Sequence, residues 1–279
     1  MAFTSEDDGR LVERHYTRGT LAEAILELLA TGGKELDRLS PGDLAPVDEF
    51  HVGGRQATID FAAQLQFAPD AHLLDVGSGL GGPSRYFALD GGCRVTGIDI
   101  TEEYVKVAAM LSQKIGLDGR TSYYKGSALA LPFGTASFDG AYMLHVGMNI
   151  RDKAALFAEI RRVLRRGTRF GIYDVMRRGD VELTYPLPWA ASAEAGFVEP
   201  VVAYRRLLEA AGFTVEAERS RLEFAVDFFE QMRARSVAGQ ALGLHLLMGQ
   251  DAATKIANMV GALSNGLIEP VEIVCRASN

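Results

Sequence analysis

Apolar residues recur along the chain with two kinds of spacing. The first part shows only the spacing of helices, whereas the rest also shows the short apolar runs of strands. Between residues 21 and 30 they are spaced as on one face of a helix, and a pair of glycines follows as a stop. A polar stretch with two prolines comes next, and a second helix is predicted from Gly54 to about Phe67. We interpret residues 1–60 as an N-terminal helical cap on a domain formed by residues 61–279.

From residue 72 onward, short apolar runs alternate with segments of helical spacing. The runs predict seven strands, at His72–Val76, Arg94–Ile100, Thr121–Tyr124, Phe138–Met143, Phe170–Val175, Thr214–Ala217 and Val271–Arg276. Helices are predicted between most of them, including Lys153–Leu164, which Gly167 is expected to end. Such alternation is typical of an α/β fold with a mostly parallel sheet covered by helices on both faces.

The region from Glu223 to about Leu263 interrupts this alternation. It is long, helical in spacing and rich in Leu and Met, and it lies just before the last strand. A helical insertion there would lie over one end of the sheet as a lid, although an ordinary packing layer is the alternative. His245 and Met248, inside its apolar run, are interpreted as core residues.

A glycine-rich turn follows the first predicted strand and has two interpretations. Gly77, Gly79 and Gly82 fit the G-x-G-x-x-G pattern of dinucleotide-binding proteins, whereas Gly77, Gly79 and Gly81 fit D-x-G-x-G-x-G. In both cases the glycines let a ligand approach the backbone at the start of a helix. Asp99 ends the next strand and suits the ribose hydroxyls of either kind of ligand.

Three further features favour one of these interpretations. Asp75 stands two residues before the glycines, residues 131–133 read Leu-Pro-Phe and residues 137–139 read Ser-Phe-Asp. Residues 157–167 read Phe-Ala-Glu-Ile-Arg-Arg-Val-Leu-Arg-Arg-Gly. Over roughly residues 61–174 the chain therefore resembles the class I methyltransferases that depend on S-adenosylmethionine (SAM), which have a Rossmann-like seven-stranded sheet.

A narrower resemblance points to small-molecule enzymes. The segment Phe50-His51-Val52-Gly53-Gly54 and the insertion before the last strand resemble the sarcosine/dimethylglycine and the ubiquinone/menaquinone methyltransferases. This implies an enzyme of class EC 2.1.1 that methylates a small molecule, with nitrogen or carbon favoured as the acceptor atom. The acceptor itself is not identified.

The resemblance also implies a set of cofactor-binding residues. They are Asp75, Gly77, Ser78, Gly79, Gly81, Asp99, Ile100, Ser127 and Ala128. Asp99 would hold the ribose and Ile100 would lie against the adenine, whereas Ser127 stands where the family often has an aspartate. Asp75 either orients the loop or contacts the ligand.

Candidates for the acceptor side come from strand ends and from the cap. His145 and Asn149 follow the fourth strand and are the candidate catalytic residues, with His145 either accepting a proton or tying the loop to the backbone. Met143, Met148, Trp189 and Tyr16 are the candidate substrate-binding residues. For Trp189 and Tyr16 the alternative is plain packing.

Composition narrows the function further. Among 279 residues the net charge is -7, and such a surface repels phosphate backbones, so nucleic acid is not expected as a partner. No signal pattern or membrane-spanning run is evident, and two cysteines support neither a disulfide framework nor a metal site. We therefore expect a cytoplasmic protein without a metal, and its oligomeric state stays open.

Two other functions remain open on the sequence. The same glycines and Asp99 would suit an NAD-dependent oxidoreductase, although residues 131–166 resemble methyltransferases better. A SAM-binding module without catalytic activity is the second, because Ser127 and the loop after the fourth strand depart from the family's pattern.

Overall fold

A computed structural model describes residues 5–237, 247–249 and 251–278 of the chain. One seven-stranded sheet runs through it in the order β3-β2-β1-β4-β5-β7-β6. The strands are β1 (His72–Val76), β2 (Arg94–Asp99), β3 (Thr121–Lys125), β4 (Phe138–Leu144), β5 (Leu164–Arg177), β6 (Phe213–Ser220) and β7 (Ile268–Ala277). Only β7 runs antiparallel to its neighbours, so the predicted mostly parallel sheet is confirmed.

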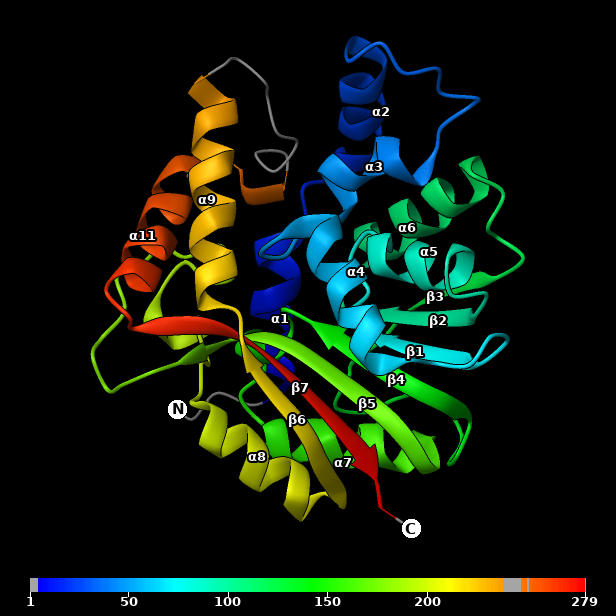
Figure 1. Cartoon of the computed structure of the whole chain (residues 1–279). Coiled ribbons are helices and arrows are strands. Elements are labelled where there is room, and N and C mark those ends of the chain that lie inside the picture. The colour runs from blue at the N-terminus through cyan, green and yellow to red at the C-terminus, as the bar shows by residue number, and fades with distance from the viewer. Residues whose placement is uncertain (1–4, 238–246, 250, 279) are drawn as a thin grey trace.

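Helices cover both faces of the sheet (Figure 1). Those on one face are α4 (Gly54–Leu65), α5 (Gly82–Leu89) and α6 (Glu102–Lys114), and those on the other are α7 (Lys153–Val163) and α8 (Val201–Ala210). Successive side chains of a strand point to opposite faces, so Tyr142 packs with Phe61 and Phe87 of α4 and α5, whereas Met143 packs with Leu156 of α7. The sheet therefore forms the middle of three layers, with an apolar core on each of its faces.

The remaining helices lie around the carboxyl ends of the parallel strands. They are α1 (Ser5–Tyr16), α2 (Leu21–Thr31), α3 (Pro41–Asp48), α9 (Leu222–Val237), α11 (Ala252–Ser264) and the short 3₁₀ helices η1 (Gly147–Asn149) and η2 (Ala193–Ala195). Helices α9 and α11 pack on each other and on β7 (Figure 1). They fall in the predicted insertion, whereas His245 lies outside the described residues. The division into a cap and a domain stays a prediction.

Two helices were not expected from the sequence. Helix α1 is mostly polar, so it contains no apolar run that would single it out, although its few apolar residues lie on one face. Helix α3 occupies the polar stretch with two prolines: Ser40 accepts a hydrogen bond from the backbone N–H of Asp43, Pro41 fits the first turn, and Leu44 and Val47 are buried. The sequence analysis predicted no helix in that polar stretch.

The end of α7 also differs from the expectation. The helix stops at Val163, and β5 begins at Leu164, so the strand is much longer than the predicted Phe170–Val175. Gly167 lies inside β5 with φ +74° and does not end the helix. Leu164, at the start of β5, pairs with Phe138 of β4 before the register shifts. This pairing explains why a strand forms after Val163 although the helical spacing of apolar residues continues there.

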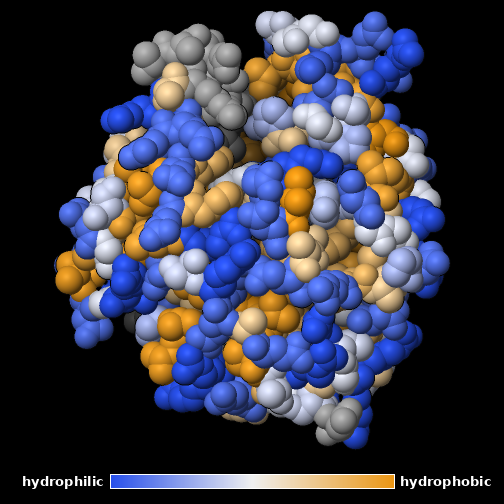
Figure 2. Space-filling view, in the orientation of Figure 1, coloured by the Kyte–Doolittle hydropathy of each residue, from blue (hydrophilic) through white to orange (hydrophobic). Residues whose placement is uncertain are grey.

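The surface is mixed in character. Figure 2 shows hydrophilic side chains over most of the visible face, with apolar side chains scattered between them. None of the helices in the described part of the chain is both long and apolar enough to cross a membrane.

Candidate functional site

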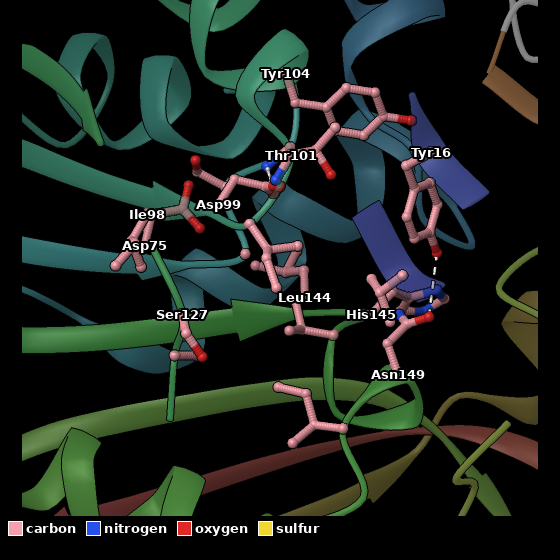
Figure 3. Close-up of a pocket in the computed structure, with 18 of the residues that line it drawn as sticks. Tyr16, Asp75, Ile98, Asp99, Thr101, Tyr104, Ser127, Leu144, His145 and Asn149 are labelled. Atoms are coloured by element: carbon pink, nitrogen blue, oxygen red, sulfur yellow. Dashed lines mark hydrogen bonds between the residues drawn. The ribbon is translucent and has the colours of Figure 1, made fainter. Parts of the chain in front are cut away.

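A cavity of about 430 Å³ opens at the carboxyl ends of β1, β2 and β4. Its walls are the glycine-rich turn after β1, the loops after β2, β3 and β4, and helix α1. Figure 3 shows Asp99, Thr101 and Tyr104 along one side, and His145 and Asn149 on the other, next to Tyr16 of α1. Parallel α/β sheets bind ligands at this edge, because the loops there diverge.

The glycine-rich turn is fixed by its backbone. The N–H groups of Gly77 and Ser78 both donate to the carbonyl of Ile98, at 2.8 and 3.0 Å. Gly77 has φ +70°, and a Cβ there would lie 2.4 Å from Cγ2 of Val146. Only glycine fits both the conformation and the space, so the turn can pass close under a ligand.

Asp99 joins the two strand ends that form the cavity floor. Its Oδ2 accepts from the N–H of Gly79 at 2.9 Å, and its Oδ1 accepts from the N–H of Thr101 at 2.8 Å. Burial raises the pKa of Asp99, and the two backbone N–H groups oppose that rise. Each carboxylate oxygen keeps a further lone pair, so Asp99 can also accept from ligand hydroxyls.

Asp75 is placed to orient the turn. It accepts from Oγ of Ser84 at 2.6 Å and from the hydroxyl of Tyr142 at 3.2 Å, which links β1, α5 and β4. Burial raises the pKa of Asp75 to about 7. Asp75 also lines the cavity, so the loop-orienting interpretation is compatible with a ligand contact.

Two buried hydroxyls on the cavity wall have no hydrogen-bond partner among the described residues. They belong to Ser78 and Tyr104. Buried hydroxyls without partners are rare, because each costs free energy unless a ligand or water satisfies it. The donor and acceptor set of this side therefore fits a polar ligand with several hydroxyl or charged groups.

Most of the other residues expected to bind the cofactor line the cavity. Ile100, Ser127 and Ala128 line the cavity, and Oγ of Ser127 accepts from the N–H of Leu129 at 3.2 Å. Gly81 is an exception. It does not line the cavity but caps α5 with φ +80°, and a Cβ there would meet Tyr123 and Arg85, so its role is structural.

His145 leaves β4 in a strained conformation. Its φ is +55°, and its backbone N–H donates to the carbonyl of Tyr173 at 2.7 Å. The ring lies 5.0 Å from the ring of Tyr173 and 5.9 Å from the ring of His51, centroid to centroid. Its Nε2 is buried, and no described residue bonds to it. Burial, followed by the neighbouring His51, holds the pKa of His145 well below its ordinary value.

Helix α1 closes the cavity from above. The guanidinium of Arg151 binds both carboxylate oxygens of Asp8, at 2.9 and 3.1 Å. At the other end of the helix the hydroxyl of Tyr16 donates to Oδ1 of Asn149 at 3.4 Å (Figure 3). Both contacts bind α1 to the loop after β4, so the N-terminal segment forms part of the site.

A smaller recess continues from the main cavity. It has a volume of about 60 Å³ and shares Tyr16, Phe50, His51 and His145 with the main cavity. Its other walls include Met148, Trp189, Met248, Phe228 and Phe229 of α9, and Ile256 and Met259 of α11. The recess therefore brings together Tyr16, Met148 and Trp189, which the sequence proposed as substrate-binding residues.

Met143 does not belong to this group. Its side chain is fully buried in the core between β4 and α7 and lines neither cavity. The expectation that it contacts the substrate is wrong, because the alternation of β4 directs it to the opposite side of the sheet from Tyr142.

Sequence reasoning missed several residues of the site. His51 lines both cavities, and its Nε2 lies 3.2 Å from Oγ1 of Thr58, which donates to Glu49 at 2.8 Å. Burial lowers the pKa of His51 to about 4 and, together with the neighbouring Asp48, raises the pKa of Glu49 to about 8. The segment around His51 was noted for its resemblance only; its position before a glycine pair was the available signal.

In the part of the chain that the structure describes, no three His, Cys, Asp or Glu side chains are grouped so as to hold a metal ion.

Comparison with known proteins identifies the domain that contains the cavity. Residues 74–172, from β1 to β5, match a family model described as a methyltransferase domain. This part of the chain is a methyltransferase domain. This matched region contains the glycine-rich turn, Asp99, Ser127 and His145.

Two curated relatives are methyltransferases with different acceptor atoms. A 24-methylenesterol C-methyltransferase 2 of Oryza sativa subsp. japonica is 40% identical over 110 residues, 39% of this chain and 30% of the relative. The O-methyltransferase cnsE of Penicillium expansum is 34% identical over 171 residues, 59% of each chain. The chain thus spans less than two thirds of these relatives, which support the domain rather than one particular activity.

Solved structures show the same fold over more of the chain. A putative sarcosine dimethylglycine methyltransferase from Galdieria sulphuraria has a TM-score of 0.67 at 19% identity, covering 80% of this chain and 85% of the other. The [4+2]-cyclase SpnF has a TM-score of 0.70 at 22% identity, covering 99% and 98%. At this identity the likeness concerns the fold alone.

The strand order is consistent with the methyltransferase domain rather than a dinucleotide-binding one. A dinucleotide-binding sheet has the order 3-2-1-4-5-6, all parallel. Here antiparallel β7 lies between β5 and β6. The oxidoreductase interpretation of the glycines is therefore not supported.

Proposed function

We propose that the protein transfers a methyl group from SAM to a small organic molecule, an activity of class EC 2.1.1. The observation that carries the proposal is the cavity itself: the domain's glycine-rich turn and Asp99 form one side, and an unpaired imidazole faces the other. SAM, when bound, would supply a methyl group on a positively charged sulfur; the acceptor atom would bond to that methyl carbon as the carbon–sulfur bond breaks and S-adenosylhomocysteine leaves.

The cofactor side would use residues already fixed by the fold. Asp99 would accept from the ribose hydroxyls, and Ile100, Ser127 and Ala128 would lie around the adenine. Ser78 and Tyr104 offer unpaired hydroxyls to the charged amino-acid end. Because Ser127 already bonds within its own turn, it replaces the family's aspartate only weakly.

On the acceptor side, His145 would take the proton that an oxygen or carbon nucleophile loses. Its lowered pKa keeps the imidazole neutral at pH 7, so Nε2 is free to bond the acceptor. A weak base of this kind suits a phenol-like or enol-like acceptor better than a simple alcohol. Asn149 would position the acceptor, and Tyr16 would hold Asn149 from α1.

The same geometry favours some acceptor atoms over others. Nitrogen or carbon was favoured on the sequence, whereas the two curated relatives methylate carbon and oxygen, as their names state. A base at the junction of the cavities has a purpose for carbon and oxygen nucleophiles, because these must lose a proton. We therefore place carbon and oxygen ahead of nitrogen.

The setting of the reaction is proposed with it. We propose that the protein acts in the cytoplasm and binds no nucleic acid, since its net charge is -7. Residues 1–60 and 223–263 are proposed to act as a cover over the cavity. Covering the reacting groups excludes water and strengthens the electrostatic contacts between them.

Binding and product analysis test this function separately. Isothermal titration with SAM, S-adenosylhomocysteine and NAD should show binding of the first two only. Mass spectrometry of reactions with a panel of phenols, enols, sterols and amines should then show a product heavier by one methylene unit. Binding of NAD but not SAM would overturn the proposal. SAM binding with no product from any acceptor would favour the non-catalytic module.

A further inference from the structure

The residues that form the recess beside His145 bear on the chemical class of the acceptor. We infer that it holds the apolar part of an uncharged acceptor and that the indole N–H of Trp189 donates a hydrogen bond to an oxygen on that part. The substrate class is thus a hydrophobic alcohol, phenol or ketone. The inference rests on the proposed function because it takes the bound molecule to be the methyl acceptor. The binding site itself can be tested without any reaction.

The walls of the recess exclude a charged guest. Phe228, Phe229, Ile256 and Met259 contribute aromatic and aliphatic surface, and the titratable side chains among the lining residues are His51, His145 and Tyr16. Burial lowers the pKa of both histidines and raises that of Tyr16, so all three are uncharged near pH 7. An ammonium or carboxylate would find no counter-charge on these walls, and burying it there would cost several kcal/mol.

Trp189 supplies the one indole of the chain to this recess. Its side chain is 3% exposed, and its Nε1 has no hydrogen-bond acceptor among the described residues. An indole N–H is a donor only, and a buried donor without an acceptor is unfavourable. An oxygen on a bound molecule would satisfy it, whereas a hydrocarbon would not.

The loop that carries Trp189 is held in place on both sides. Leu187 and Ala190 exchange backbone hydrogen bonds of 2.8 and 3.1 Å across it. Nε2 of His15 in α1 lies 3.0 Å from the carbonyl of Pro188, and Nδ2 of Asn258 in α11 donates to the carbonyl of Pro186 at 2.9 Å. The indole is therefore preset by the cap and the insertion together, so little ordering is required when a ligand binds.

Three small probes of nearly equal shape test this inference on the full chain. Phenol offers an oxygen and a hydroxyl proton, anisole offers only the oxygen, and benzene offers neither. With ¹⁵N-tryptophan labelling the protein gives a single indole N–H signal, because it contains one tryptophan. Phenol and anisole should move the indole proton downfield, which benzene should not do, and both should bind more tightly than benzene.

The variant Trp189→Phe separates the hydrogen bond from the packing. It keeps an aromatic ring and removes the donor, so phenol and anisole should lose roughly two- to twelvefold in affinity while benzene is retained, as measured by calorimetry. Phe228→Leu is the matched control, since it changes the wall without touching a donor, and all three probes should weaken alike. SAM affinity should match the parent in both variants, whereas the melting temperature should fall in both, because each shortens a side chain packed in the same apolar cluster.

Two results would overturn the inference. Equal affinity of parent protein for phenol, anisole and benzene would show that no donor faces the recess. Persistence of the preference for oxygen in Trp189→Phe would assign it to another group. Neither result bears on SAM binding or on product formation, so a failure here is distinguishable from a failure of the proposed function.

Discussion

The backbone N–H of His145 donates to the carbonyl of Tyr173 at 2.7 Å, and this bond joins the end of β4 to β5 while His145 holds a φ of +55°. If His145 continued the strand, the pleating of β4 would direct its side chain to one face of the sheet. The left-handed conformation instead turns the imidazole into the junction of the two cavities. Strain of this kind persists only where neighbouring contacts hold it.

His145→Asn and His145→Ala test the role of that imidazole. If it accepts the acceptor's proton, turnover should fall roughly 10²- to 10⁴-fold, the usual contribution of a general base, while SAM affinity stays at the parental level. Asparagine also tolerates the left-handed backbone, so its melting temperature should be close to that of the parent. Loss of melting temperature in proportion to turnover in both variants would make His145 structural.

The pH profile offers an independent view of the same residue. Because burial and His51 lower the pKa of His145, the neutral form persists as the pH falls through 6.5. Titration of His145 should therefore not change the rate between pH 6.5 and 8, and the fall in rate caused by its protonation should lie below pH 6.5. His51→Gln removes the effect of His51 on the pKa of His145, so this fall in rate should move to higher pH. A fall in rate centred at 6.5 in the parent would contradict the assignment.

Asp99→Ala is expected to weaken SAM binding by roughly 1.5–3 kcal/mol, because a charge-assisted contact to the ribose would be lost. Since Asp99 also accepts from Gly79 and Thr101, the turn itself is disturbed. Asp99→Asn keeps one acceptor oxygen and serves as the milder comparison. Calorimetric titration measures both. Unchanged affinity in the alanine variant would remove Asp99 from the cofactor side.

Gly77→Ala should destabilise the turn for two separable reasons. The positive φ costs about 1–2 kcal/mol for a residue with a side chain, and the added Cβ overlaps Val146. In the double variant Gly77→Ala with Val146→Ala the overlap is relieved and only the backbone cost remains. Chemical denaturation should show the double variant to be the less destabilised relative to Val146→Ala. Equal effects in the two backgrounds would mean that the contact is unimportant.

Asp75 gives a stability prediction with a definite sign. Its pKa is about 7 in the fold and near 3.8 when unfolded, so between these values the folded state holds a proton that the unfolded state has lost. This contribution to stability is complete below pH 3.8 and is lost as the pH rises to 7. Asp75→Asn should therefore reduce the fall in unfolding free energy from pH 5 to pH 8. Asp118→Asn, at an exposed position, should leave that fall unchanged.

Hydrogen exchange tests the cover over the cavity. With S-adenosylhomocysteine added, α1 and the insertion helices should gain protection together with the glycine-rich turn. Asp8→Asn weakens the bidentate contact to Arg151 and should raise exchange in α1 without ligand. Protection of the turn alone would contradict a cover that responds to the cofactor.

The sequence by itself determined the sheet and the cofactor side. Alternating apolar runs and a glycine turn are local signals, because strand pleating and left-handed backbone depend on neighbouring residues. Gly77, Asp99 and Ser127 therefore lie at the cavity that their positions after strands predicted. Gly81 does not line the cavity, because it caps α5 and lies against Arg85 and Tyr123.

Only the tertiary structure decided the acceptor side. Helix α1 is mostly polar, yet it covers the cavity because Asp8 and Tyr16 bond to partners 143 and 133 residues away in the sequence. Met143 is buried by the alternation of β4, which a run of apolar residues does not reveal. Packing of distant segments likewise decides that Nε2 of His145 and Nε1 of Trp189 have no partner among the described residues, since hydrogen bonding is a property of the packed chain and not of a segment.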